Sequence, residues 1–208
     1  MTRRADYTSD EWALLTKSVE TVGLGMLAVS NAGLIGRLRE LHTLSRCLTR
    51  RALPIQFARN ELVLALLEEC NAQEQASGTV QKLSSDNVAG LVAAVVAAHV
   101  RMLSRCQRVA ALLAAKSPLD EADGLKQWLV WIARRVAEAS GDGWFGLGRK
   151  VTDEKASMLA EIATALQMSR VARIPTTAEL DALLGPTSQG PCEVSSGGGH
   201  GSDGGPDR

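Results

Sequence analysis

The feature that most constrains the fold is an apolar run at residues 88–100, near the middle of the chain. The run contains no charged residue, and His99 is its one strongly polar side chain. It belongs to a longer stretch with helical spacing, residues 86–116, whose length as a helix would be about 45 Å at 1.5 Å per residue. A helix without a polar face is expected to be buried on most sides. The sequence therefore predicts a central helix that other helices of the same chain enclose around Val95.

Helical spacing also dominates the rest of the chain, whereas signals for β-strands are nearly absent. Aromatic residues make up only 3% of the sequence, and no alternation of apolar and polar residues persists. Thr8 and Glu11 form the T-x-x-E pattern of a capping box. Ser117 and Pro118 match an N-cap and a first helical position, and Thr152 caps a further helix. The pattern thus predicts helices at residues 8–30, 34–51, 57–76, 117–140 and 152–168, and a short one at 176–185.

These elements predict an all-α, single-domain bundle of six or seven helices with a central apolar helix and a disordered C-terminal tail. Gly23 and Gly25 are expected to let another helix approach the first one closely. The inward side of residues 34–51 is expected to consist of leucines, namely Leu34, Leu38, Leu41, Leu44 and Leu48. The predicted division is a flexible N-terminus at 1–7, the bundle domain at 8–168, an extended segment with the short helix at 169–185, and a disordered Gly/Ser/Pro-rich tail at 186–208.

The charge balance argues against nucleic acid as a partner. Lys plus Arg equals Asp plus Glu, at 23 each, so no overall field attracts nucleic acid or an anionic membrane, and self-association is tolerated. No secretory signal is visible, and the apolar stretch at residues 26–35 is shorter than the about 20 residues of a membrane span. The cytoplasm follows by elimination. Three cysteines are expected to be reduced thiols packed as small hydrophobes, with the fourth in the tail: Cys47, Cys70, Cys106 and Cys192.

No catalytic or cofactor-binding constellation is recognisable. His42, His99 and His200 lack the spacing of a zinc site or of a catalytic triad. The acidic pairs of the chain are adjacent in sequence, so their side chains diverge on a helix and do not share a proton or a metal. We therefore expect no catalytic residue and no cofactor. An enzyme stays open only with a site that cannot be read from the sequence.

The most unusual segment is a glycine-rich loop at residues 141–150. Two interpretations stay open for its aromatic pair, Trp144 and Phe145: a hydrophobic plug at the end of the bundle, or an exposed patch that binds a partner. Arg149 and Lys150 follow and would add two cations to such a surface. This loop is the candidate interaction site. The clustered acids, which are the weak candidates for a metal site, are Asp142, Asp153 and Glu154.

Both ends of the predicted domain resemble a known family. Thr8 opens the segment T-S-D-E-W-A-L-L, and Val151-Thr with Glu154 follows the glycine-aromatic loop. These segments are similar to an uncharacterised family of small bacterial all-helical proteins, with T-x-E-E-W-x-L-L early and E-G-G-F-L-G-F-G-G-x-x-V-S-x-x-E late. The loop is about one residue shorter here, and Thr152 replaces a serine. The resemblance covers about residues 8–168 and implies the fold alone. The late pattern is also faintly similar to tellurite-resistance TerB-like bundles, but their acidic metal cluster is missing.

The sequence favours a non-enzymatic cytoplasmic interaction or accessory module. Its partner would be another protein or a second copy of the chain, and neither nucleic acid nor a membrane span is expected. Two alternatives remain. The first is a ligand- or metal-binding bundle of the stress-response type, similar to TerB-like proteins, and the second is the enzyme described above.

Overall fold

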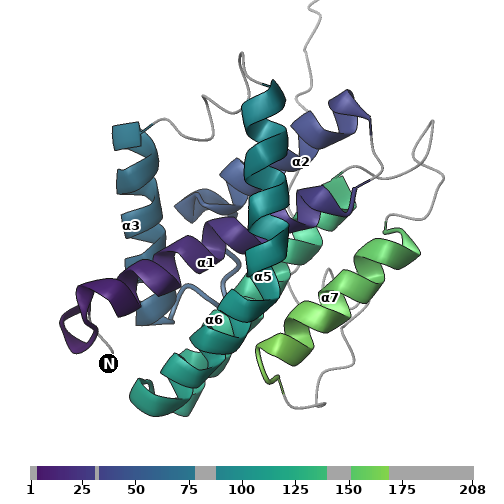
Figure 1. Ribbon diagram of the computed structural model, residues 1–208. Coiled ribbons are helices and arrows are strands. Elements are labelled where there is room, and N and C mark those ends of the chain that lie inside the picture. The colour runs from purple at the N-terminus through teal and green to yellow at the C-terminus, as the bar shows by residue number, and fades with distance from the viewer. Residues whose placement is uncertain (1–3, 31–32, 78–87, 140–150, 169–208) are drawn as a thin grey trace, which may run out of the picture. The chain divides into compact units, whose positions relative to one another are not determined.

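The computed structural model describes residues 4–30, 33–77, 88–139 and 151–168. Within these ranges the chain forms six α-helices and two short 3-10 helices, without a strand (Figure 1). The chain divides into two compact units, Met1–Arg173 and Ile174–Arg208, and every described residue belongs to the first. The predicted all-α helical bundle is thus confirmed. The predicted short helix at 176–185 and the tail at 186–208 lie outside the described residues.

Helix α1 (Ser9–Ala28) begins where the capping box predicts it. The Glu11 amide donates to Thr8 Oγ1 at 3.3 Å, and the Thr8 amide donates to the Glu11 carboxylate at 2.7 Å. These reciprocal bonds satisfy donors that a helix start otherwise leaves unpaired. Residues 21–27 are all buried, so the second half of α1 lies in the interior of the first unit.

Helix α5 (Val88–Lys116), the long teal helix of Figure 1, packs mainly against α1. The two helices approach closely at Gly25, where an added Cβ would collide with the side chain of Met102. The close approach expected from this glycine is therefore confirmed. From here to its C-terminal end, α5 turns a row of completely buried side chains toward the core: Met102, Cys106, Val109 and Leu113.

The prediction that other helices of the chain enclose this helix around Val95 is wrong. Val95 is buried, but Val92, Val96 and Val100 expose 43%, 55% and 74% of their surface. The close approach of α1 lies at Met102, beyond this run. Among the described side chains of residues 92–100, Val95 and Ala98 are therefore buried, whereas Val92, Val96 and Val100 face outward. The second half of α5 instead contributes the completely buried side chains of Met102, Cys106, Val109 and Leu113 to the core.

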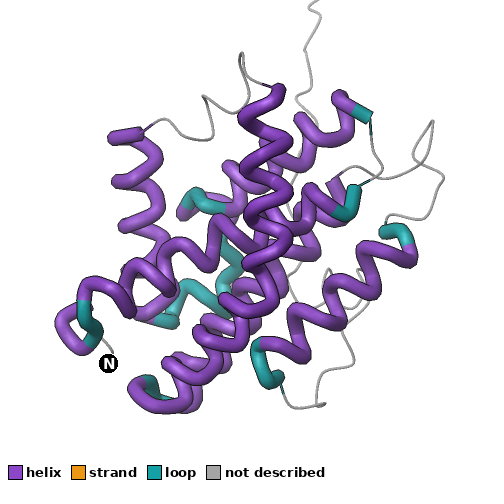
Figure 2. The backbone as a smooth tube through the Cα atoms, viewed as in Figure 1, coloured by secondary structure: helices purple, strands orange, loops and turns teal. Residues whose placement is uncertain are grey.

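Helix α2 (Leu34–Cys47) is followed by a 3-10 helix (Arg50–Ala52) and by α3 (Glu61–Ser77). Figure 2 shows loop in the connection between α2 and α3, which also contains this 3-10 helix. Leu41 and Leu44 are buried as predicted, whereas Leu38 exposes 40% of its surface, which corrects its expected inward position. Glu40 takes the buried place instead, because positions 40, 44 and 47 share one face of the helix.

Helices α6 (Leu119–Ala139) and α7 (Asp153–Ala165) complete the described fold. Helix α6 contacts α1, α2, α3 and α7, and its side chains Trp128, Leu129 and Ile132 are completely buried. Helix α7 starts behind the predicted cap, since the Lys155 amide donates to Thr152 Oγ1 at 3.4 Å. It packs against both α5 and α6.

Asn60 links the start of α3 to α6. Its Oδ1 accepts a hydrogen bond from the Val63 amide at 3.0 Å, and its Nδ2 donates to the carbonyl oxygen of Glu121 at 3.0 Å. Gly124 leaves room for this amide, because a Cβ at that position would collide with Asn60 Nδ2. Because Asn60 caps the helix, α3 begins at Glu61, four residues later than the predicted start at residue 57.

Candidate functional site

Most of the predicted site residues lie outside the described residues: Asp142, Trp144, Phe145, Arg149 and Lys150. They stay predictions. Asp153 and Glu154 are exposed in the first turn of α7, where the positive end of the helix dipole favours acidic side chains. Across the described ranges, no group of three or more His, Cys, Asp or Glu side chains is placed to hold a metal ion.

The described histidines lie on two different helices. His42 is exposed on α2, and His99 is half-buried on α5. Nδ1 of His99 is buried and has no hydrogen-bond partner among the described residues. Neither histidine lines the hollow or the groove reported below. Their placement is therefore that of ordinary surface and core side chains.

The three described cysteines are free thiols in apolar surroundings, as the sequence predicts. Cys47 and Cys106 are buried, and Cys70 is half-buried. Burial raises the pKa of Cys47 to about 11 and the pKa values of Cys70 and Cys106 to about 12. A thiol with such a pKa holds almost no thiolate at neutral pH, and the thiolate is the reactive form. Burial and a raised pKa therefore favour a packing role over a nucleophilic role for these residues.

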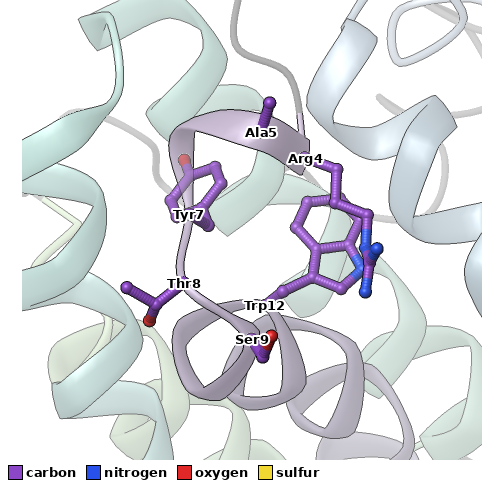
Figure 3. A pocket seen from close by; sticks show the side chains of 6 residues that line it. All are labelled: Arg4, Ala5, Tyr7, Thr8, Ser9 and Trp12. Atoms are coloured by element: carbon purple, nitrogen blue, oxygen red, sulfur yellow. The ribbon is translucent and has the colours of Figure 1, made fainter.

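A hollow of about 300 Å³ lies beside the start of α1, next to the 3-10 helix Arg4–Asp6. Figure 3 shows the Tyr7 and Trp12 rings on opposite sides of it, with Arg4 alongside Trp12. The ring centroids are 5.9 Å apart, and the planes are tilted by 43°. The Arg4 guanidinium lies 5.9 Å from the Trp12 ring centroid, and Lys116 Nζ lies 6.0 Å from that of Tyr7. Aromatic rings and cations are thus paired within the chain itself.

This hollow is explained by the helix start. Tyr7 precedes the N-cap and Trp12 is the fourth helical residue, which are the two positions of a hydrophobic staple. The Tyr7 hydroxyl is 2.6 Å from Ser117 Oγ, and Trp12 Nε1 donates to Glu69 of α3 at 3.3 Å. Burial raises the pKa of Tyr7. Arg4 Nε also lies 3.8 Å from Glu69 Oε2 of α3. Residues 4–7, which the sequence assigns to a flexible N-terminus, therefore contact the α5–α6 connection through Tyr7 and α3 through Arg4.

A buried ion pair joins α2, α6 and α7. Lys155 Nζ donates to Glu40 Oε1 at 2.8 Å and to the carbonyl oxygen of Ala137 at 3.2 Å. Glu40 exposes 0% and Lys155 2% of its surface. Glu40 Oε2 is buried and has no hydrogen-bond partner in the described part of the chain. Because removing one ion of such a pair leaves the other uncompensated, each side chain depends on the other.

The arrangement of the pair points to a structural role. Lys155 carries a positive charge in the first turn of α7, where the helix dipole disfavours it, and it is also removed from water. The Glu40 carboxylate and the Ala137 carbonyl oxygen offset both costs and fix α2 and α7 against the end of α6. The sequence reasoning missed this pair. Its signal is that Glu40 lies four residues before Leu44, and Lys155 four before Leu159, so each charge falls on an apolar face.

A groove of about 600 Å³ runs between α5 and α7. Leu103 of α5 and two alanines of α7 give it an apolar part. Among the described residues that line the groove, Glu161 is the one with a charge, so these residues offer no second charged group for acid–base chemistry. The remaining lining residues are neutral and polar: Gln107, Ser157, Thr164 and Gln167.

The described surface has one apolar helix face, which we call the valine face: Val92, Val96 and Val100 of α5. The three side chains recur every four residues and point to one side of the helix. Ala93 beside them is exposed and Ala97 is half-buried, while the first charged residue along the helix is the exposed Arg101. Other large apolar side chains that are exposed in the described ranges occur singly or as one pair: Ile35, Leu38, Ile55 and Leu119.

No protein-family model matches the chain, and no match was found among curated proteins or solved structures. Among the helices described, none has both the length and the apolar character that a membrane crossing requires.

Proposed function

We propose that the protein is a non-enzymatic interaction module that binds the apolar face of a helix on another polypeptide chain. The observation that carries this proposal is the exposure of the valine face on α5. A surface helix normally turns polar or charged side chains toward water. A contiguous apolar face in that place is typical of a contact surface.

The exposed area favours a partner that is itself apolar. Burying a valine completely stabilises by about 1.5 kcal/mol or more. Val92, Val96 and Val100 expose 43%, 55% and 74% of their surface. If the value for each valine is multiplied by its exposed fraction, covering the valine face would contribute about 2.5 kcal/mol per chain to the free energy of binding. The absence of charged residues from 88–100 means that burial, not ion pairing, drives the contact. Anchors that recur at helical spacing suit a helix as the docked element.

The alternatives have less support from the described residues. For an enzyme, the buried Glu40–Lys155 pair is fully accounted for by helix packing, and the groove beside α7 offers one carboxylate. For a metal-binding bundle, Asp153 and Glu154 are accounted for by the helix dipole. The loop with Trp144 and Phe145 stays a second proposed contact surface, independent of the valine face.

Photo-cross-linking tests the proposal. A photoreactive phenylalanine derivative at position 96 should give a covalent adduct in living cells, and mass spectrometry should locate the attached peptide on the apolar face of a helix. The same residue at Gln127, which is exposed on α6, is the matched control and should give little adduct. Equal labelling from positions 96 and 127, or no adduct from position 96, would overturn the proposal.

A further inference from the structure

We infer that the partner of the valine face is a second copy of this chain, packed antiparallel through α5. This inference rests on the proposed function. The valine face forms a straight ridge of identical side chains at every fourth position. Two such ridges pack into each other's grooves when two helices cross at about −50°. Ala93 and Ala97 lie next to the ridge and are small, so they form the groove that a neighbouring ridge needs.

A two-fold axis at Val96 matches the ridge to itself. With the axis there, Val96 of one copy meets Val96 of the other, and Val92 meets Val100. All three exposed valines of both copies are then covered by one contact. An isologous interface of this kind uses the same patch on both subunits and closes at the dimer.

Charge decides between the two orientations. Arg101 is exposed and follows the valine face directly. In a parallel pair the two Arg101 side chains would face each other. In the antiparallel pair they lie at opposite ends of the contact, about 15 Å apart along the helix axis, which exceeds the screening length of about 8 Å in physiological salt. The chain as a whole has a formal net charge of zero, so two copies meet without overall repulsion.

The size of the valine face predicts a weak dimer. A stable interface buries about 800 Å² on each partner, and a crossing that covers three valines and two alanines is much smaller. We therefore expect a dimer that forms only at high protein concentration and separates on dilution. A dimer this weak is best detected by a cross-link that holds the two copies together covalently.

Disulfide trapping tests the register. Val92, Val96 and Val100 are each changed to cysteine in the full chain, with Cys192→Ser as background, and oxidised at high protein concentration. Val96→Cys should form a covalent dimer. Val92→Cys alone should not, because its two copies lie about 12 Å apart along the axis, beyond the about 7 Å that a disulfide bridges. A mixture of Val92→Cys and Val100→Cys should cross-link. Ala111→Cys, exposed on the same helix, is the control and should stay monomeric.

The outcomes separate this inference from the proposed function. Efficient dimers from Val92→Cys alone would overturn the antiparallel register. If Val96→Cys forms no dimer but the photoreactive group at position 96 joins a helix of a different protein, the second copy is excluded and the proposed function stands. If position 96 gives neither product, both fail. Unchanged thermal unfolding of each variant shows that it is folded, since the altered side chains are exposed.

Discussion

Replacing Lys155 with methionine should destabilise the protein strongly. The substitution keeps most of the buried apolar stem but leaves the Glu40 carboxylate buried without its partner at 2.8 Å. Breaking a buried pair from one side costs about 3–5 kcal/mol. Removing a positive charge from the first turn of α7 stabilises the fold by about 0.3–1 kcal/mol, because the charge opposes the helix dipole there. We therefore expect a net loss of about 2–5 kcal/mol in the free energy of unfolding. Glu40→Met should cost about 3–5 kcal/mol, since it strands the lysine.

The double variant Glu40→Met, Lys155→Met distinguishes the contribution of the ion pair to stability from the contribution of side-chain packing. Exchanging a whole buried ion pair for apolar side chains is often neutral or stabilising, so its stability should lie within about 1 kcal/mol of the wild type. Urea unfolding followed by far-ultraviolet circular dichroism measures all four proteins. For a domain of this size, the loss in Lys155→Met corresponds to a Tm lower by about 4–20 °C. A loss below about 1 kcal/mol in Lys155→Met, or a double variant as unstable as the two singles added, would refute the reasoning.

Three further predictions follow from other contacts. Gly124→Ala gains about 1 kcal/mol of helix propensity. The added Cβ displaces Asn60, whose cap and hydrogen bond together contribute about 1–3 kcal/mol to stability. The urea midpoint of unfolding should therefore fall, and a rise would contradict this prediction. Burial raises the pKa of Cys47 to about 11 and that of Cys106 to about 12. At pH 8 both thiols should therefore react with a thiol reagent at least about 100-fold more slowly in the folded than in the unfolded protein. Equal rates would show that these thiols are accessible in the folded protein. The hydrogen bond from Lys116 lowers the pKa of Glu11, so this carboxylate stabilises the fold above its usual pKa of 4.5 and the contribution disappears as pH falls through the lowered value. Glu11→Gln should therefore lose less stability on acidification, as measured by Tm against pH, than the wild type does.

The starts of the helices could be predicted because their causes are local. The Thr8 and Glu11 side chains satisfy amides three residues away, and Thr152 does the same for Lys155. Such bonds need only a short segment, so the residue types at fixed spacing indicate them. The role of Gly25 was also predictable, because a missing Cβ in an otherwise apolar helix has few uses except close packing.

The covered face of α5 could not be predicted, because it depends on where another helix crosses. Apolar character at residues 88–100 shows a preference for burial but not which neighbour supplies it. The close approach of α1 lies at Met102, and this position is set by the tertiary fold and not by the run itself. The same apolar residues that predicted an interior helix thus form the valine face, which the sequence reasoning missed as a candidate site.

The buried ion pair is a second case in which distance along the chain hides a contact. Glu40 and Lys155 are 115 residues apart. Each could be recognised alone as a charge on an apolar helix face, but a single sequence does not say which two such charges meet. Once the fold brings α2 and α7 together at the end of α6, the pairing follows from the cost of burying either charge alone.

Sedimentation velocity on the wild type, Val96→Lys and Ala111→Lys tests the docking surface on α5 most directly. Both positions are exposed on the same helix, so the two lysine variants should unfold at the same temperature as the wild type. The wild type and Ala111→Lys should sediment faster as their concentration rises through the hundreds of micromolar, while Val96→Lys should remain a monomer. Association of Val96→Lys at wild-type strength, or a wild type that stays monomeric throughout that range, would contradict self-association through the valine face.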